Sequence, residues 1–330
     1  ELPPLTDSRF GLLAEATART RGATRDTTLI RDAGAEVSWA KVSNVTPGDY
    51  PALARSQGRE VADLTPAQVA GVLSDYESIK RERGVIDFED ILLCTVAMMH
   101  EHPEIAAQIR ERYQHFTVDE YQDVSPLQQS LLMAWLGDRD DVCVVGDPAQ
   151  TIHSFAGAQA DFLTGFPRRH PDATVVRLVR DYRSTPQVTT LANEVIAKAS
   201  GRAAGTRLEL QGMREPGPDP TFKAYESEEV EAKEVAGQVL TLLNQGVKAS
   251  EIAILYRINA QSEQFEQALA YAGVVYQVRG GEGFFRRPEI LEAIRVLIAA
   301  TRRDDLPEDP VAIARAAFVE LGLSATEPQG

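Results

Sequence analysis

The stretch HFTVDEYQD, from His115 to Asp123, decides how the rest of the sequence is interpreted. Its residues 116–118 are β-branched or aromatic, which is typical of a buried strand. Asp119, Glu120 and Asp123 follow at once, and carboxylates cannot lie in a protein core without partners. We therefore expect functional chemistry at the carboxyl end of this strand.

The composition is that of an ordinary soluble globular protein, with 43% hydrophobic and 25% charged residues. The length of 330 residues suits about two domains. The net charge of −15 argues against non-specific nucleic-acid binding by the whole surface, although it allows a local basic groove. No apolar run approaches the roughly 20 residues that span a bilayer, so we expect no membrane contact.

The two cysteines, Cys94 and Cys143, lie far apart in sequence and both inside apolar runs. This pattern predicts reduced core residues of a cytosolic protein, and a metal site built on them is not expected. The chain begins at Glu1 without an initiator methionine, and it ends after an unfinished helical pattern. These ends suggest a piece of a longer polypeptide.

Residues 2–115 are alanine-rich and show helical periodicity. Thr65 followed by Pro66 predicts an N-cap with proline at the first helical position. The segment 86–113 alternates apolar and polar residues at helical spacing, which predicts an amphipathic helix pair that covers a sheet. The first third of the chain is therefore expected to be helical.

From about residue 113 to 178 the pattern changes to strand, helix, strand, helix, strand. The predicted strands are nearly all apolar, as parallel strands covered by helices on both faces must be; they are FTVDE (116–120), DVCVVGD (141–147) and TVVRLV (174–179). Ligands bind such sheets beyond the carboxyl ends of the strands. We therefore expect Asp119 and Glu120 to converge with Asp147 and Gln150.

A second alternation of strands and helices follows. The strands TFKAYES (221–227) and EIAILYR (251–257) flank a predicted helix over residues 228–245. The loop around residues 178–183 is the candidate boundary between the two alternations.

Carboxylates at the end of a strand allow a functional and a structural interpretation. Mg²⁺ on a nucleotide needs a carboxylate at fixed distance, and an adjacent second carboxylate can deprotonate the attacking water. Asp123, however, could simply cap the helix that begins at Ser125 and Pro126. That structural alternative applies to Asp123 better than to Glu120.

The stretch VVGDPAQTIHSFAGA (144–158) contains a second group of polar residues. A tight turn explains the Gly-Asp-Pro step without any function. It does not explain why Gln150, His153 and Phe155 cluster next to the acidic pair. A neutral donor such as Gln can contact a terminal phosphate, and exposed His and Phe can stack on unpaired bases.

Five stretches together resemble one family. VDEYQD (118–123), GDPAQTIHSFAGA (146–158) and LVRDYRST (178–185), in this order and spacing, resemble motifs II, III and IV of the UvrD/PcrA/Rep family of superfamily 1A DNA helicases. IAILYRINAQS (252–262) is similar to that family's motif IVa, and the pattern GG-x-x-FF-x-R-x-EI at 280–290 also matches. Several long motifs in the correct order are far more specific than any one of them.

The resemblance implies an α/β fold: partial RecA-like, parallel-sheet lobes of a P-loop NTPase with an all-helical N-terminal insertion. The implied domains are a helical 1B-like subdomain (1–111), the C-terminal half of RecA-like domain 1A (112–178), the N-terminal part of RecA-like domain 2A (179–290) and the start of a 2B-like helical subdomain (291–330).

The resemblance also implies roles in ATP hydrolysis. Asp119 would hold Mg²⁺ through water, and Glu120 would be the general base. Gln150 would couple the γ-phosphate to the DNA site, and Arg183 would reach the γ-phosphate from the second lobe. A rigid guanidinium can neutralise developing phosphoryl charge. The structural alternative for Arg183 is an ion pair with Asp181 at a helix start.

Roles at the DNA are implied as well. Phe155 matches a position on which the family stacks a base, and His153 takes the place of a tyrosine seen in many members. Phe155 could instead belong to the core, and Ala156 replaces an arginine common in PcrA-like members. Three further residues match positions along the single strand: Arg257, Asn259 and Gln261.

The family's phosphate-binding loop, G-x-x-x-x-G-K-[ST], has no counterpart here, because the sequence contains no Gly-Lys dipeptide. Motifs V and VI are absent too. We therefore expect the parent protein to be an ATP- and Mg²⁺-dependent 3′–5′ DNA helicase or translocase of repair or replication. It would act on single-stranded DNA and duplex junctions in the cytoplasm, at the nucleoid, and the chain alone would be inactive. The alternatives are the helicase arm of a helicase–nuclease, and a non-enzymatic DNA-binding scaffold.

Overall fold

A computed structural model describes residues 3–6, 8–22, 24, 26–61, 63–198, 208–279, 292, 294–296 and 298. The chain divides into two compact units, Glu1–Pro220 and Thr221–Gly330. The motif at 280–290 and most of the predicted helical segment 291–330 lie outside the described residues. Each unit is therefore described by itself.

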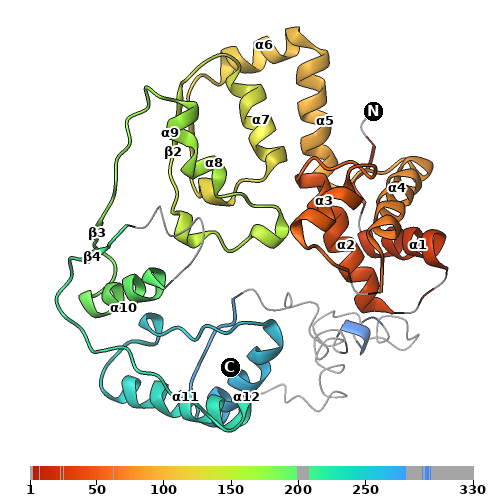
Figure 1. Ribbon diagram of the computed structural model, residues 1–330. Coiled ribbons are helices and arrows are strands. Elements are labelled where there is room, and N and C mark those ends of the chain that lie inside the picture. Colours follow the sequence, from red (N-terminus) through yellow and green to blue (C-terminus); the bar gives the residue numbers. More distant parts are fainter. Residues whose placement is uncertain are drawn as a thin grey trace, which may run out of the picture. The chain divides into compact units, whose positions relative to one another are not determined.

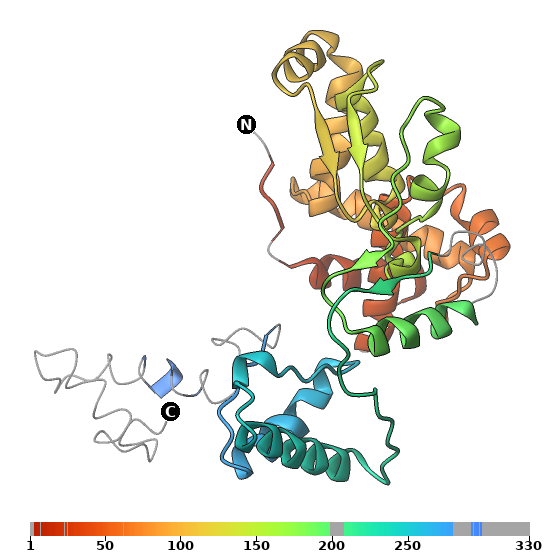
Figure 2. The ribbon, with the colours of Figure 1, turned by 90° about the vertical axis from the view of Figure 1, so that its left-hand side faces the viewer.

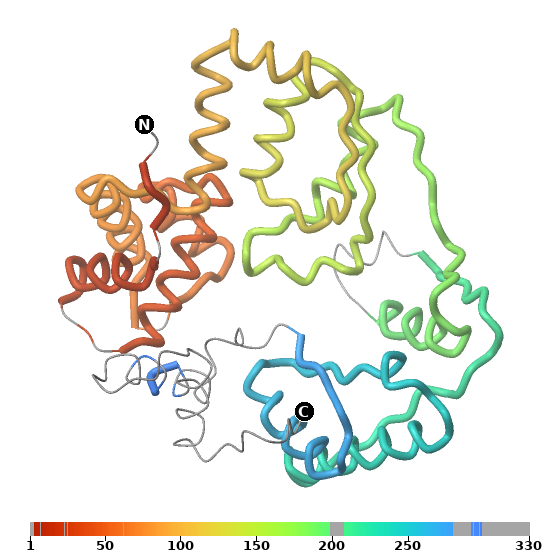
Figure 3. The backbone as a smooth tube through the Cα atoms, turned by 180° about the vertical axis from the view of Figure 1, so that it is seen from behind, coloured from red at the N-terminus to blue at the C-terminus, as the bar shows by residue number. Residues whose placement is uncertain are grey.

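Unit 1 begins with a bundle that we call the helical region (residues 9–83), drawn in red to orange in Figures 1 and 3. Its helices are α1 (Arg9–Arg21), α2 (Thr27–Val42), α3 (Tyr50–Gln57) and α4 (Pro66–Arg83). Thr65 caps α4 as predicted, because its hydroxyl accepts the backbone N–H of Gln68 while the Gln68 side chain accepts that of Thr65. Gly84 ends α4 with a φ of 62°, a left-handed conformation that glycine adopts without strain.

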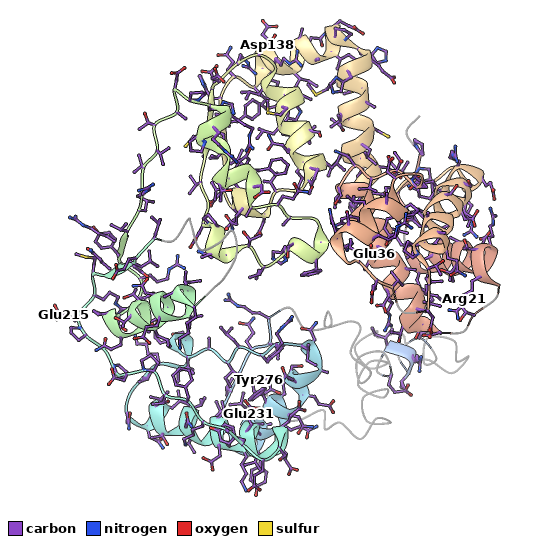
Figure 4. The ribbon with its side chains drawn as sticks, viewed as in Figure 1. Arg21, Glu36, Asp138, Glu215, Glu231 and Tyr276 are labelled. Atoms are coloured by element: carbon purple, nitrogen blue, oxygen red, sulfur yellow. The ribbon has the colours of Figure 1, made fainter. Side chains whose placement is uncertain are left out.

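The helical region has a continuous core that draws on all its helices. Tyr76 and Ile79 of α4 are fully buried in it, together with Ala16 of α1 and Val37 of α2. At the edge of this core lies Glu36, labelled in Figure 4, whose carboxylate accepts hydrogen bonds from Tyr50 Oη at 2.8 Å and from the guanidinium of Arg59. A small helical bundle is stabilised by the burial of apolar side chains, which contributes about 25 cal/mol for each Å² of apolar surface removed from water.

Helices α5 (Phe88–Glu101) and α6 (Pro103–Arg112) confirm the predicted helix pair over residues 86–113. Pro103 separates them, because proline fits the first turn of a helix and not its interior. Both pack against α7 (Pro126–Leu136). The contact buries Met99 and Ala106 against Ala134.

A small parallel sheet follows the helix pair, and Figure 2 shows its two strands side by side. Strand β1 (Phe116–Val118) pairs with β2 (Val142–Val144), with Thr117 opposite Cys143. The sheet's inner face packs on Tyr121, Leu132 and Phe166. Two of the three strands predicted between residues 113 and 178 are thereby confirmed in shorter form. With α7 and the segment up to residue 170, they form what we call the sheet region (residues 113–170).

The other predicted strands were wrong for the described residues. The segments 174–179, 221–227 and 251–257 form no strand. A strand requires a neighbour that pairs with its N–H and C=O groups. In these segments no ladder is formed, and the Val179 carbonyl alone accepts a hydrogen bond from β4 (Gln211–Gly212), from the N–H of Gln211 at 2.8 Å. Their apolar side chains are largely uncovered: Val176 is 73% exposed, Phe222 80% and Leu255 92%. The prediction that helices cover both faces of the sheet was also wrong, because Thr117 and Cys143 face outward and are exposed.

The prediction of two core cysteines was wrong as well. Cys94 and Cys143 are both free thiols, and both are exposed. Cys94 lies on the outer side of α5, and Cys143 on the uncovered face of β2. Apolar neighbours in sequence do not bury a side chain when the element has only one covered face.

The rest of unit 1 consists of short elements. Their bounds are α8 (Asp161–Thr164), α9 (Phe166–Arg169), β3 (Arg180–Asp181), α10 (Pro186–Ala197) and β4 (Gln211–Gly212). Strand β3 pairs with β4 in parallel, and α10 packs beside β4. This group of elements positions the turn at residues 181–184.

Unit 2 contains two paired helices in its described part, α11 (Glu228–Asn244) and α12 (Ser262–Tyr271). Ala236 and Val239 of α11 are buried against Leu269 of α12. The predicted helix over 228–245 is thus confirmed to within one residue. A single helical turn, η6 (Asn259–Gln261), precedes α12.

The two compact units divide after Pro220, whereas the predicted boundary lies at residues 178–183. The four predicted domains stay a prediction. Within the residues that the structure describes, no helix combines the length and the apolar character needed to cross a membrane.

Candidate functional site

The end of β1 places its two carboxylates in a tight turn. Asp119 is exposed, and its Oδ1 accepts the backbone N–H of Glu120 at 2.9 Å. Glu120 has a φ of 50°, one of the few non-glycine residues in the left-handed region. Such a conformation costs about 1–2 kcal/mol and is found most often at functional sites. The turn therefore presents both side chains at the carboxyl edge of the sheet.

Gln122 connects this turn to the next one. Its side chain is fully buried. Its Nε2 donates to Glu120 Oε2 at 2.6 Å, and its Oε1 accepts the backbone N–H of Asp147 at 3.0 Å. One buried amide therefore joins the ends of β1 and β2.

The turn after β2 continues the network. The Asp147 carboxylate accepts the backbone N–H of Ala149 at 2.9 Å and the side-chain amide of Gln150 at 3.1 Å. The structure thus brings Asp119, Glu120, Asp147 and Gln150 to one edge of the sheet, where the sequence predicts them. The link through Gln122 was not predicted. A glutamine two positions after Glu120, where its amide can reach the Glu120 carboxylate, is the signal that could have revealed it.

Asp123 does not cap α7, so the structural alternative considered for it was wrong. Ser125 is the N-cap, with its hydroxyl accepting the backbone N–H of Gln128. Asp123 Oδ1 is buried and makes no hydrogen bond among the described residues.

Arg183 lies in the turn between β3 and α10. Asp181 Oδ1 accepts the backbone N–H groups of Ser184 at 2.9 Å and Arg183 at 2.7 Å. These two hydrogen bonds hold the pKa of Asp181 below its usual value. The contact between Asp181 and Arg183 therefore runs through the backbone of Arg183. Its exposed guanidinium is not what holds the turn together.

His153 and Phe155 lie on the loop after Gln150. Their ring centroids are 6.2 Å apart, and the Phe155 side chain is 71% exposed. The alternative that Phe155 belongs to the core was therefore wrong. Two exposed rings at this separation form a surface on which a planar group can stack.

The three predicted DNA-contacting residues of unit 2 lie at the start of α12. Arg257 and Asn259 are exposed. Gln261 Oε1 accepts the backbone N–H groups of Arg257 at 3.0 Å and Ile258 at 3.3 Å. This cap uses the side-chain oxygen of Gln261, so its NH₂ group is what it can offer to a ligand.

A second cluster of charges lies at the edge of the helical region, and we call it the buried ion cluster: Lys41, Glu77, Lys80, Asp87 and Asp90. Lys41 Nζ is 2.7 Å from Asp87 Oδ1 and 2.6 Å from Asp90 Oδ1. Lys80 Nζ is 3.2 Å from Asp87 Oδ2 and 2.9 Å from Glu77 Oε1. The cluster thus joins α2, α4 and the start of α5.

The three carboxylates of this cluster lie close enough together to hold a metal ion. The two ammonium groups already lie among them and offset two of the three negative charges, and the guanidinium of Arg9 lies 3.9 Å from Asp87 Oδ2. Burial would raise the pKa of Asp87, but its hydrogen bond to Lys41 and the charges of Lys41 and Lys80 outweigh burial and hold that pKa far below its usual range. The cluster is therefore an ion-pair network that positions α5.

Two family descriptions match the sequence. The UvrD/REP helicase N-terminal domain matches residues 17–171, and the UvrD-like helicase C-terminal domain matches residues 176–307. The chain belongs to the UvrD-like helicase family. The two matches meet between residues 171 and 176, near the predicted boundary between the lobes. Membership also establishes the fold class, which is that of the RecA-like helicase domains.

Several characterised helicases are similar to this UvrD-like chain. The ATP-dependent DNA helicase UvrD2 of Mycobacterium tuberculosis is 51% identical over 332 residues, which cover 99% of this chain and 47% of the relative. PcrA of Bacillus subtilis is 33% identical over 78% of this chain and 34% of the relative, and DNA helicase II of Escherichia coli is 35% identical over 71% and 32%. The chain spans about half the length of the first relative and about a third of the other two.

Proposed function

We propose that this chain carries the second half of the ATPase site in the first RecA-like lobe of an ATP-dependent DNA helicase or translocase. The observation that supports the proposal is the hydrogen-bonded group at the ends of β1 and β2, which contains Glu120, Gln122, Asp147 and Gln150. The family supports the activity, since PcrA of Bacillus subtilis is named an ATP-dependent DNA helicase. Polarity from 3′ to 5′, and a role in repair or replication, follow from the resemblance of the motifs.

Asp119 is the residue that would hold Mg²⁺ through water. It is exposed at the carboxyl end of a parallel strand, and only its Oδ1 is engaged by a backbone N–H among the described residues. Its other oxygen fits the oxygen ligands that Mg²⁺ prefers. Bound Mg²⁺ neutralises charge on the nucleotide's phosphates.

Glu120 is the proposed general base, which takes the proton of the water that attacks ATP. The hydrogen bond from Gln122 fixes one of its carboxylate oxygens, so the other faces solvent at the edge of the sheet. Gln150 is proposed to contact the γ-phosphate and to couple it to the DNA site. Arg183 would neutralise charge on the phosphate from the second lobe, and its exposed guanidinium is consistent with that role.

Single-stranded DNA and duplex junctions are the proposed partners. The exposed rings of His153 and Phe155 would stack on unpaired bases. Along the strand, the proposed contacts of unit 2 are Arg257, Asn259 and the NH₂ group of Gln261. A partner of this kind locates the protein at the nucleoid, in the cytoplasm.

The test is Glu120→Gln in a full-length protein that contains this chain. We expect ATP turnover with single-stranded DNA to fall about 10²–10⁴-fold, because general-base catalysis contributes that much. ATP binding, measured with a fluorescent analogue, should be nearly unchanged. Glu111→Gln on the exposed face of α6 is the matched control and should keep full turnover. Near-normal turnover of Glu120→Gln would mean that the base lies elsewhere.

The 330-residue chain alone is a second test. Its sequence contains no Gly-Lys dipeptide, so it offers no phosphate-binding loop of the G-x-x-x-x-G-K-[ST] type. We expect no DNA-stimulated ATPase from the purified chain, measured by phosphate release. Clear stimulation by single-stranded DNA would show that the chain holds a complete site of another kind.

A further inference from the structure

We infer that Gln122 is a positioning residue: its buried amide orients the Glu120 carboxylate and ties it to the turn that carries Gln150. This inference rests on the proposed role of Glu120. It assigns a role to Gln122, which lies inside the stretch VDEYQD (118–123) but receives no role from the sequence.

The two contacts of Gln122 require an amide. One end must donate to a carboxylate, which is Glu120 Oε2 at 2.6 Å, and the other must accept a backbone N–H, which is that of Asp147 at 3.0 Å. Glutamine offers a donor and an acceptor on one planar group without a change in protonation. Because Gln122 is fully buried, water cannot replace it in either contact.

Glu120 needs such a partner because its backbone is in the left-handed region, with φ at 50° and ψ at 40°. That conformation directs the side chain, but an exposed glutamate still rotates about its own bonds. The hydrogen bond from Gln122 removes this freedom for one oxygen. A general base held in one orientation is what proton transfer from a positioned water requires.

Gly146 makes room for the amide. A Cβ at this position would lie 2.4 Å from Gln122 Oε1, 2.9 Å from Leu163 Cδ2 and 3.1 Å from the backbone nitrogen of Tyr121. Any larger residue at 146 would therefore displace the Gln122 side chain. The tight turn is one reason for a glycine at position 146, and the space that the Gln122 amide occupies is a second.

The contact also connects two turns. From Glu120 a continuous set of hydrogen bonds runs through Gln122 to Asp147, and from the Asp147 carboxylate to Gln150 Nε2 at 3.1 Å. If the turn that carries Gln150 moved, the Glu120 carboxylate would therefore move as well, because the two are joined through the side chain of Gln122.

The decisive variant is Gln122→Met in a full-length protein that contains this chain. Methionine has a similar length, but it can neither donate to Glu120 Oε2 nor accept the Asp147 N–H as an amide does. The Glu120 carboxylate would then rotate about its own bonds, and it would lose its link to the turn that carries Gln150. We expect kcat for ATP to fall about 10- to 100-fold.

Two controls separate this effect from a loss of structure. Gln129→Met removes an amide of the same size, the partner of the Tyr121 hydroxyl on α7, and should leave kcat unchanged. The urea midpoints of Gln122→Met and Gln129→Met, measured side by side, show that both variants are folded in the assay. A KM for ATP within about threefold of the wild type would show that nucleotide binding is intact.

Gly146→Ala tests the same contact without replacing a charged group or an amide, and it serves if Gln122→Met does not fold. We expect kcat to fall about 10- to 100-fold, because a displaced Gln122 leaves Glu120 misaligned. Unchanged kcat in Gly146→Ala or in folded Gln122→Met, or a loss of kcat in Gln129→Met as large as in Gln122→Met, would overturn the inference. Glu120→Gln in the same assay keeps the two hypotheses apart: if it is active the proposed base is wrong, and if it is inactive while Gln122→Met is normal, only the positioning role is wrong.

Discussion

The helical region and the sheet region of unit 1 differ in how completely their own residues bury apolar side chains and pair backbone groups. The helical region has one continuous core and joins its last helix to α5 by the buried ion cluster. The sheet region has two paired strands of three residues, and one face of that pair is exposed. Helices pair their backbone groups internally, whereas a strand depends on residues that are distant in sequence. A helical segment therefore reaches its final structure with fewer distant partners.

The residues that stabilise unit 1 and the residues proposed for catalysis also lie in different regions. Asp119, Glu120 and Gln150, three of the residues proposed for ATP hydrolysis, lie at the open edge of the sheet. The most buried ionic groups among the described residues lie at the edge of the helical region. Helix α5 connects the two, because Asp87 at its start belongs to the ion cluster and its far end packs on α7, which follows directly on the Glu120 turn. Three predictions test how different the two regions are.

The largest effect is expected for Lys80→Met. Lys80 is 2% exposed, and its removal leaves Lys41 as the one ammonium group of the cluster for the carboxylates of Glu77, Asp87 and Asp90. Breaking a buried ion pair on one side costs about 3–5 kcal/mol. Urea unfolding followed by Trp39 fluorescence, in a Trp135→Phe background, measures the free energy of unfolding of the helical region. Arg83→Met on the same helix breaks an exposed ion pair with Glu15 and should cost less than about 1 kcal/mol. Equal costs for the two variants would contradict the contrast.

A smaller effect is expected on acidification. Because the folded pKa of Asp87 lies far below its unfolded value of about 3.9, its contribution to stability is complete above that pH. It is lost as the pH falls further, toward the folded pKa. The same Trp39 signal should show the urea midpoint falling below about pH 4. Asp87→Asn should be less stable at neutral pH and should show a weaker fall; parallel curves for the two proteins would assign the acid sensitivity to other carboxylates.

The smallest effect is expected for Val176→Thr in the exposed segment 174–179. With 73% of Val176 exposed, the change in the free energy of unfolding should stay within about 0.5 kcal/mol. Val72→Thr in α4 is the matched control: Val72 is fully buried, and replacing one of its methyl groups by a hydroxyl should cost about 1 kcal/mol or more, even though the hydroxyl can donate to a carbonyl of the preceding turn. Thermal unfolding followed by circular dichroism compares them. A cost for Val176→Thr as large as that of the control would show that the segment packs in a sheet, as its sequence predicts.

Much of the fold could be predicted from local patterns. Helix caps and helical periodicity act over a few residues. The helix start predicted at Thr65 and Pro66, and the helices α7 and α11 predicted from periodicity, were therefore confirmed. The strands at 174–179, 221–227 and 251–257 could not be predicted in the same way. Their apolar residues are suited to a sheet, but a ladder forms only beside a paired strand, and the described residues form such pairs only between β1 and β2 and between β3 and β4. The prediction of two buried cysteines was wrong for a similar reason, since apolar neighbours in sequence do not show which face of an element is covered.

The sequence by itself determined which residues are candidates for chemistry, because the order and spacing of the stretches around Asp119, Gln150 and Arg183 identify the family without any coordinates. Only the tertiary structure decided how those candidates are held. The buried amide of Gln122 lies between Glu120 and Asp147, and Asp147 follows Gln122 by 25 residues in the sequence. The glycine at 146, which leaves space for this amide, is almost as distant in sequence. Such contacts form only when two strands lie side by side, and no local pattern in the sequence encodes that proximity.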